Sequence, residues 1–413
     1  MRPFSALPYT RLPVTTFLLA LLALLPLGVP PTGAGEPVRL TMILRDEAGA
    51  VVGAGRPVFG PVEIEVAVQP AGLRFGRLEL YIDGRRAGVL EAPPYRLLVD
   101  TGQRNAEHRF EAVAFGGAGE ALAAASLRSG RVEADLDVEV RLQHLYLTAL
   151  RGGLPVAGLG SEDFSIYDQG VLQRVATCDS GDLPFSAALL LDASASMEGG
   201  RLRAALAGAR AFAAALQRLD EAKLLLFSDR LRLESPFTAV PAVLELGLQG
   251  VVAGGGTMLN DALYLAIKRL ESRPGRRVVV LLSDGVDVES VLPMSWVRQA
   301  LRASQVVVYW LRLPTGDPEG ARRFTVWRNA EGHRREAEEL RAAVLESGGR
   351  IEQLGRIEQV ESKLAGVAAE LRSQYALSFY PSASLGHGRW HDLRVTARGR
   401  DLRLRAQSGY LER

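Results

Sequence analysis

Between residues 184 and 372, short unbroken apolar runs alternate with longer segments whose apolar residues recur every three or four positions. Runs of the first kind predict strands that are buried on both faces, and we place them at 187–191, 223–227, 278–282 and 306–311, with a further strand at 350–354. The intervening stripes, such as the one from Leu202 to Leu216, predict amphipathic helices. This alternation predicts a doubly wound, mainly parallel α/β sheet with helices on both faces.

Oxygen-bearing side chains follow the ends of these predicted strands. Asp192, Ser194 and Ser196 come after the first strand, Thr257 follows the glycine run 254–256, and Asp284 follows the strand at 278–282. In open α/β sheets, ligands bind outside the carboxyl ends of the strands, where these residues fall. We expect their side chains to face solvent there, and such oxygens suit a hard divalent cation.

The order of these residues resembles the metal-ion-dependent adhesion site of von Willebrand factor A domains: Asp-x-Ser-x-Ser, then Thr after a glycine loop, then Asp after a later strand. The resemblance implies that Ser194, Ser196 and Thr257 ligate through neutral hydroxyls, while Asp192 and Asp284 act mainly through water. Mg²⁺ is the first choice of ion, with Mn²⁺ or Ca²⁺ as alternatives. Such an ion is poorly neutralised and would take an acidic oxygen from a partner protein.

The resemblance therefore implies an exported, non-enzymatic adhesion or assembly protein. One alternative is a structural β-rich scaffold whose site is unused, with its Ser and Thr only capping helices. A hydrolase is disfavoured because Gly-x-Ser-x-Gly is absent and no histidine lies in 188–285. An aspartyl phosphotransferase would need a second acid where Ser194 stands. A phosphate-binding loop is also disfavoured, because no Gly-Lys-Ser/Thr follows the glycine run.

Residues 1–34 have the pattern of a secretory signal peptide. Arg2 and Arg11 precede the apolar stretch 17–25, which is too short to span a membrane, and Thr32, Gly33 and Ala34 offer a cleavage site. We expect a secreted or periplasmic protein without a membrane span after cleavage; an uncleaved anchor is the alternative. Removing residues 1–34 takes away two arginines and no acid, so the formal net charge of +2 falls to zero, which argues against nucleic acid as a partner.

Residues 36–132 have a period of two, as in the alternation of Val62, Ile64, Val66 and Val68 with Glu63, Glu65 and Ala67. Turns at regular spacing, such as the one at Asp83 and Gly84, predict a small all-β sandwich. The sequence at 79–84, 92–95 and 107–110 resembles that of bacterial immunoglobulin-like modules, and this resemblance implies a spacer or recognition module.

Two further β segments flank the α/β region, at 136–180 and 374–413. Neither has enough strands to bury its apolar face alone, so we expect them to pair with each other. The stretch 159–170 and the ending around 388–391 and 408–410 are similar to a bacterial group of von Willebrand factor A-related proteins that is common in acidobacteria. That resemblance covers roughly residues 137–411.

Three remaining features lie outside these patterns. Cys178 is the only cysteine, so no internal disulfide is possible, and we expect a half-buried inert thiol; a bond to another chain is the alternative. His387 and His391 flank a glycine loop, and we interpret them as surface residues and not as a zinc pair. The charged insertion 316–335 contains Phe324 and Trp327, which we expect to hold the loop on its own domain; contact of Trp327 with a partner is the alternative.

Overall fold

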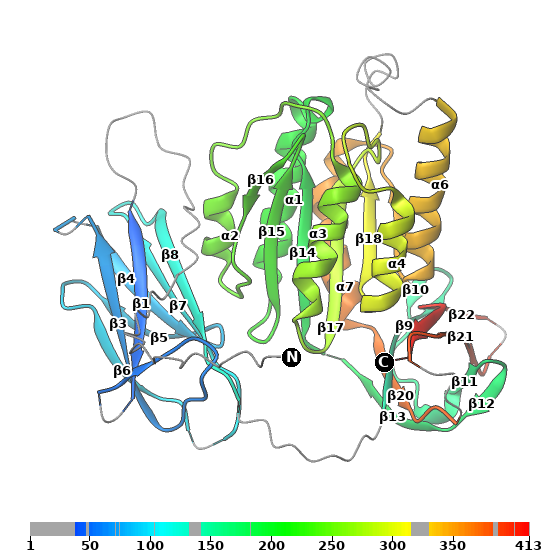
Figure 1. The fold of residues 1–413 in the computed structure, drawn as a ribbon, viewed down its shortest axis with the longest axis horizontal. Coiled ribbons are helices and arrows are strands. Elements are labelled where there is room, and N and C mark those ends of the chain that lie inside the picture. Colours follow the sequence, from blue (N-terminus) through cyan, green and yellow to red (C-terminus); the bar gives the residue numbers. More distant parts are fainter. Residues whose placement is uncertain are drawn as a thin grey trace, which may run out of the picture.

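The computed structural model describes residues 38–412 except 47–48, 71, 74, 103, 132–141, 182, 315–329, 383–386 and 400. Figure 1 shows a β-sandwich, a central sheet covered by helices, and a second β unit, arranged in a row. The predicted signal peptide, most of the predicted strand that begins at 136, and Phe324 and Trp327 lie outside the described residues.

The N-terminal part consists of two antiparallel four-stranded sheets. One has the order β2 (Val51–Val52), β1 (Arg39–Arg45), β3 (Pro61–Gln69) and β6 (Arg96–Asp100). The other has the order β5 (Arg85–Leu90), β4 (Arg77–Ile82), β7 (Arg109–Phe115) and β8 (Ala121–Arg128). Val62, Ile64 and Val66 of β3 are buried in the core between the two sheets, as their alternation predicts.

The central sheet has six strands, in the order β16 (Leu231–Glu234), β15 (Glu221–Phe227), β14 (Phe185–Asp192), β17 (Arg276–Ser283), β18 (Val307–Arg312) and β19 (Arg350–Gln353). All neighbours pair in parallel except β15 and β16. The predicted doubly wound, mainly parallel sheet is confirmed. The short antiparallel edge strand β16 was not predicted, because four residues carry too little pattern to detect.

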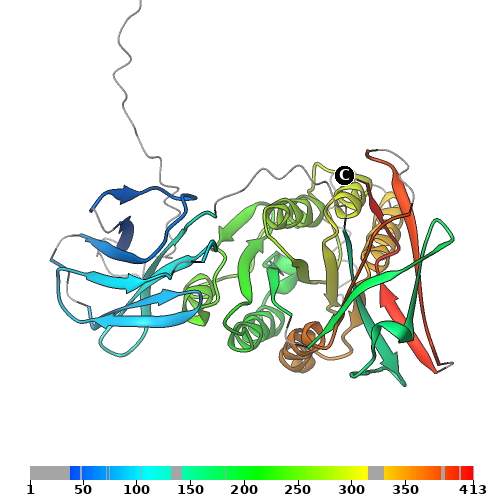
Figure 2. The ribbon, with the colours of Figure 1, turned by 90° about the horizontal axis from the view of Figure 1, so that it is seen from below.

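Helices cover both faces of this sheet, as Figure 2 shows from below. On one face α1 (Gly200–Ala214) and α7 (Val360–Arg372) share a hydrophobic core with the strands. On the other face α3 (Leu259–Glu271), α4 (Met294–Ser304) and α6 (Ala330–Glu346) share a second core with them. The short helix α2 (Pro241–Gly247) packs against β8 of the sandwich. None of the helices in the described ranges is long and apolar enough to cross a membrane.

The second β unit is built from both flanks of the α/β region. One sheet has the order β10 (Leu154–Pro155), β9 (Gln143–Arg151), β20 (Tyr375–Phe379) and β13 (Val175–Ser180), with β22 (Leu402–Ala406) also paired to β9. The other has the order β12 (Val171–Gln173), β11 (Phe164–Asp168), β21 (Trp390–Ala397) and β23 (Gly409–Leu411). Strands that precede the central sheet in sequence are therefore paired with strands that follow it.

Buried polar contacts join the three parts. Arg109 of the sandwich donates to Glu221 at the start of β15, with Nη1 and Oε2 2.8 Å apart. Gln374 donates to the Thr148 hydroxyl of β9 and to the Tyr309 hydroxyl of β18. In Figure 1 both outer parts lie toward the lower side of the central sheet, away from the carboxyl ends of its parallel strands.

Candidate metal centre

The register of the central strands places Asp192 beside Ser283. β14 pairs in parallel with β17, with Leu191 opposite Leu282, so the next residue of each strand lies at the same edge. The Ser283 hydroxyl donates to Asp192 Oδ2 at 2.7 Å, and the backbone N–H of Ser194 donates to Asp192 Oδ1 at 2.9 Å. The connections diverge to opposite sides of the sheet here, which is the position expected for a ligand site.

Backbone hydrogen bonds bring the glycine run to the same point. Gly254 donates to the carbonyl of Ala193 at 2.9 Å, and Ala195 donates to the carbonyl of Gly255 at 3.0 Å. Gly255 has φ of +82°, a conformation that an L side chain rarely adopts. Thr257 therefore follows a loop that is fastened to the Asp-x-Ser-x-Ser segment.

Backbone hydrogen bonds also join the segment after Asp284 to Thr257. The carbonyl of Thr257 accepts hydrogen bonds from the N–H groups of Val288 and Glu289, at 2.9 and 3.1 Å. The Asp284 carboxylate accepts one from the N–H of Val286 at 3.1 Å. The hydroxyls of Ser194 and Ser196 lie 3.1 Å apart. The structure thus brings all five predicted residues to one edge of the sheet.

The predicted exposure of these side chains is wrong for four of the five. Asp192, Ser194, Thr257 and Asp284 are 0%, 1%, 6% and 5% exposed, and only Ser196 is exposed. The loops that follow the strands fold over the sheet edge and bury these four side chains. Such burial depends on segments far apart in the chain, so the pattern of a single segment cannot predict it.

The burial has an electrostatic consequence. Burial and the nearby Asp284 carboxylate raise the pKa of Asp192 to about 6, against the lowering effect of its hydrogen bonds. Among the described residues, no lysine, arginine or histidine forms an ion pair with either carboxylate. Two buried carboxylates that are close enough to repel each other, and that have no ion-pair partner in the described part of the chain, form a donor set that fits a divalent metal ion.

Ser283 is a site residue that the sequence reasoning missed. It directly precedes Asp284, and its hydroxyl donates a hydrogen bond to Asp192. Its position between the apolar run and the predicted ligand was a usable signal. Within the described ranges, no three His, Cys, Asp or Glu side chains are grouped to hold a metal ion, so the candidate centre depends on serine and threonine hydroxyls.

His391 is not a surface residue. Its side chain is 1% exposed, with Nδ1 2.8 Å from Asp168 Oδ1 and Nε2 3.2 Å from Glu412 Oε2. Its ring also stacks on Tyr410, with the centroids 4.6 Å apart. The strand alternation of β21 turns His391 inward, where polar partners from β11 and the end of the chain satisfy it. His387 is exposed, so the two histidines do not form a pair.

Cys178 is half-buried, as predicted, and it has no disulfide partner. Burial raises the pKa of its thiol, and nearby acids such as Asp179 add to this effect. A thiol with a raised pKa is less often a thiolate, which agrees with an inert role.

Comparison with known proteins matches residues 187–286 to the family model of the von Willebrand factor type A domain. A search of curated proteins finds no match. Similar solved structures include an aerotolerance-related membrane protein from Bacteroides fragilis, at 20% identity over 45% of this chain and 99% of that chain, with a TM-score of 0.35.

A second is a von Willebrand factor type A protein from Catenulispora acidiphila, at 12% identity over 67% of this chain and 75% of that chain, with a TM-score of 0.37. A third is the vWF domain of the pilus tip protein Mfa5 from Porphyromonas gingivalis, at 12% identity over 46% of this chain and 95% of that chain, with a TM-score of 0.33. The family match does not reach the N-terminal sandwich, whose likeness to immunoglobulin-like modules stays a prediction. Residues 187–286 therefore match the von Willebrand factor type A domain family, and this segment contains all five candidate ligands at the carboxyl edge of the sheet.

Proposed function

We propose that this protein is an exported, non-enzymatic adhesion or assembly protein that binds a partner protein through a divalent metal ion. Ser194, Ser196 and Thr257 would hold the ion through their hydroxyls, and Asp192 and Asp284 would act mainly through water. When bound, the ion supplies an open coordination position for an acidic oxygen of the partner. Mg²⁺ suits this site best, because it keeps several waters and needs few protein ligands; Mn²⁺ and Ca²⁺ are the alternatives.

The observation that carries the proposal is the buried pair Asp192 and Asp284, whose carboxylates have no ion-pair partner among the described residues and which lies beside three hydroxyl-bearing residues. An uncompensated buried carboxylate is costly, so a fold that keeps two of them together gains from binding a cation there. The exposed Ser196 leaves one side of the group open to solvent and to a partner.

Binding of a partner is favoured over catalysis because the ligand set is mostly neutral. Neutral hydroxyls leave a divalent ion with unsatisfied positive charge, which favours capture of a further carboxylate. A zinc hydrolase would instead use histidine and carboxylate ligands to activate water. No histidine lies between residues 188 and 285.

The test is titration of the full chain with Mg²⁺ and Mn²⁺ by calorimetry, for the wild type, Asp192→Asn and Thr257→Ala. We expect each variant to lose at least tenfold in metal affinity, because each removes either a buried charge or a ligand. Matched controls are Asp179→Asn and Thr396→Ala, which change the same residue types at exposed positions of the second β unit.

Both controls should bind metal like the wild type. Circular dichroism would check that every variant keeps its secondary structure. Unchanged affinity in Asp192→Asn and Thr257→Ala would reject the assignment of the site. In that case the β-rich scaffold with an unused site would be the better description.

A further inference from the structure

The turn formed by Ser283, Asp284 and Gly285 is held by the end of a neighbouring strand. The Ser283 carbonyl accepts two hydrogen bonds, from Trp310 Nε1 at 3.1 Å and from the backbone N–H of Leu313 at 3.2 Å. The carbonyl of Asp284 accepts a third, from Arg312 Nε at 3.3 Å. All three donors lie at the carboxyl end of β18 or one residue beyond it.

The indole ring of Trp310 also limits the shape of this turn. Trp310 is 1% exposed and packs in the core under α3 and α4. Gly285 has φ of +82°, and a Cβ atom at Gly285 would overlap the ring of Trp310. Glycine is therefore required at 285 both by its backbone conformation and by the ring beside it.

The same turn determines the positions of both acids of the candidate centre. Asp284 is its middle residue, and Ser283 donates its hydroxyl to Asp192 at 2.7 Å while accepting the N–H of Gly285 at 3.1 Å. A shift of the Ser283 backbone would therefore move the Asp284 carboxylate and break a hydrogen bond to Asp192. Metal sites depend on such supporting contacts for their ligand geometry.

We propose that Trp310 is a positioning residue of the metal centre: its indole N–H and ring hold the Ser283–Gly285 turn so that Asp192 and Asp284 face one ion. This inference rests on the proposed metal function. Trp310 does not touch the ion, and its effect passes through the carbonyl of Ser283 and the backbone of Gly285.

The decisive variant is Trp310→Phe, which keeps a buried aromatic ring and removes the N–H donor. We expect its dissociation constant for Mg²⁺ to rise roughly three- to tenfold, as for the loss of one hydrogen bond. The matched control is Trp296→Phe on α4, because Trp296 is 58% exposed and its replacement should leave metal affinity unchanged.

A second variant tests the route of the effect. Ser283→Ala removes the hydroxyl that reaches Asp192 and should weaken Mg²⁺ binding through the same turn. If Trp310 acts through Ser283, the double variant Trp310→Phe/Ser283→Ala should lose less affinity than the two single losses multiplied together. Losses that multiply would mean that Trp310 does not act through this turn.

A spectroscopic measurement on the wild-type chain separates positioning from a purely structural role. In the wild-type chain labelled with 5-fluorotryptophan, Mg²⁺ should shift the ¹⁹F signal of Trp310 and leave that of Trp296 in place. The signals can be assigned from single Trp→Phe variants at 296, 310 and 390.

The outcomes are distinguishable. If the wild type binds Mg²⁺ and Trp310→Phe binds it equally well, with no shift of the Trp310 signal, the positioning role is wrong while the metal function stands. If the wild type binds neither Mg²⁺ nor Mn²⁺, both the proposed function and the positioning role are overturned.

Discussion

Asp192 combines two properties that rarely occur together in a residue kept only for stability. It is fully buried, and it lies close enough to Asp284 for the second carboxylate to raise its pKa. In the metal-free protein this arrangement costs free energy, because the ionised form is disfavoured inside the fold. Such unfavourable burial of charge is common at functional sites, where a protein is less stable than it could be because the site must bind a ligand.

Replacing Asp192 by Asn should therefore stabilise the metal-free protein. In EDTA at about pH 7.5 we expect the free energy of unfolding to rise by about 1 to 3 kcal/mol, since one pKa unit corresponds to about 1.4 kcal/mol. Added Mg²⁺ should stabilise the wild type and not the variant. Thermal melting of both proteins with and without the ion measures this.

The matched control for that experiment is Asp229→Asn. Asp229 is more exposed, and a hydrogen bond from the Ser228 hydroxyl lowers its pKa. Removing its charge should not stabilise the metal-free protein. A lower melting temperature for Asp192→Asn in EDTA would contradict the view that its charge is a cost.

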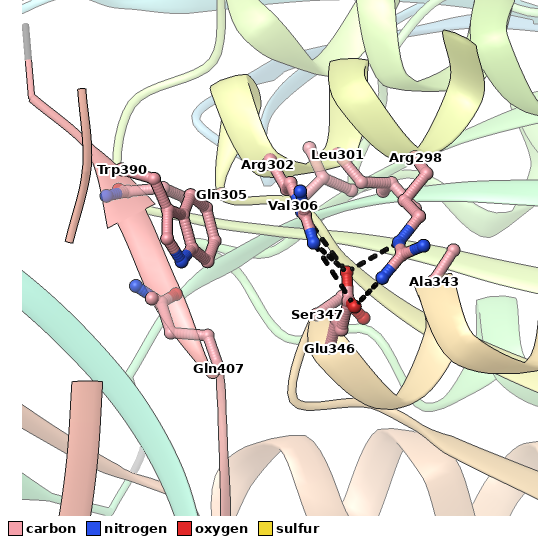
Figure 3. Close-up of a pocket in the computed structure, with 11 residues that line it drawn as sticks. Arg298, Leu301, Arg302, Gln305, Val306, Ala343, Glu346, Ser347, Trp390 and Gln407 are labelled. Carbon is pink, nitrogen blue, oxygen red and sulfur yellow. Dashed lines mark hydrogen bonds and ion pairs between the residues drawn. The ribbon is translucent and has the colours of Figure 1, made fainter. Parts of the chain in front are cut away.

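Glu346 shows the opposite behaviour, because its charge is paired. Figure 3 shows Arg298 and Arg302 of α4 reaching the Glu346 carboxylate at the end of α6, beside Trp390 of the second β unit. Arg298 Nε lies 2.8 Å from Glu346 Oε2, and Arg302 Nε lies 3.2 Å from the same oxygen. These pairs, led by the hydrogen bond from Arg298, lower the pKa of Glu346.

We expect Glu346→Gln to destabilise the protein by about 1 kcal/mol at neutral pH. A carboxyl with a lowered folded pKa contributes stability above its unfolded pKa of about 4.5, and this stability is lost as the pH falls through the folded value. The difference in melting temperature between wild type and variant should therefore shrink below about pH 4.5. A difference that stays constant down to about pH 3 would show that the ion pairs contribute little.

At the scale of elements, β20 connects the two flanks of the α/β domain. It pairs with β9 on one side and β13 on the other, and Tyr375, Leu377 and Phe379 are completely buried. These side chains form one core with Leu145 and Leu147 of β9 and with residues of β11 and β21. Without the strands after residue 374, the segment before the domain would expose an apolar face.

Deleting residues 374–413 should therefore cause aggregation, which light scattering and dye binding to exposed apolar surface would detect. A matched pair of point variants checks whether burial of the apolar side chains of β20 is the cause. Leu377→Ser should lower the melting temperature, whereas Ala376→Ser, at a less buried position on the same strand, should change it little. A soluble deletion whose remaining parts melt as before would mean that the β unit is not a single folding unit.

For the whole molecule, metal binding and partner binding should be coupled. Each should strengthen the other by the same factor, because the ion needs an acidic oxygen and the partner needs the ion. The two cores of the α/β domain consist of apolar strands and helices and are independent of the ion. EDTA should thus release the partner without unfolding the protein.

Capture of proteins from a native extract, with Mg²⁺ or with EDTA, followed by circular dichroism of the eluted protein, measures both effects. Changing the partner's essential acid to its amide should weaken capture greatly, because an amide brings no charge to the ion. Equal capture under both conditions would exclude a metal-bridged contact.

Local patterns were sufficient for the fold class, and they also suggested the candidate site residues. The apolar runs around 187–191 and 278–282 form strands that are buried on both faces. Such burial can be predicted from the sequence, because consecutive apolar residues point to opposite faces of a sheet. Asp192 directly follows such a run, Thr257 directly follows a glycine loop, and Asp284 follows a run after one intervening residue, so all three could be selected as candidates. The carboxyl ends of parallel strands lie at one edge of the sheet, so sequence order alone placed these residues together.

Only the tertiary structure showed how deeply these residues are buried and what holds them. Ser283 and Asp192 are 91 positions apart in the chain, and His391 and Asp168 are 223 apart. Whether a polar side chain is exposed depends on which distant segment covers it and satisfies its hydrogen bonds, and a local pattern carries no information about that segment. For this reason the candidate ligands could be predicted from the sequence, while their burial, the inward turn of His391 and the hydrogen bond from Trp310 to Ser283 came from the packing of strands that the sequence places far apart.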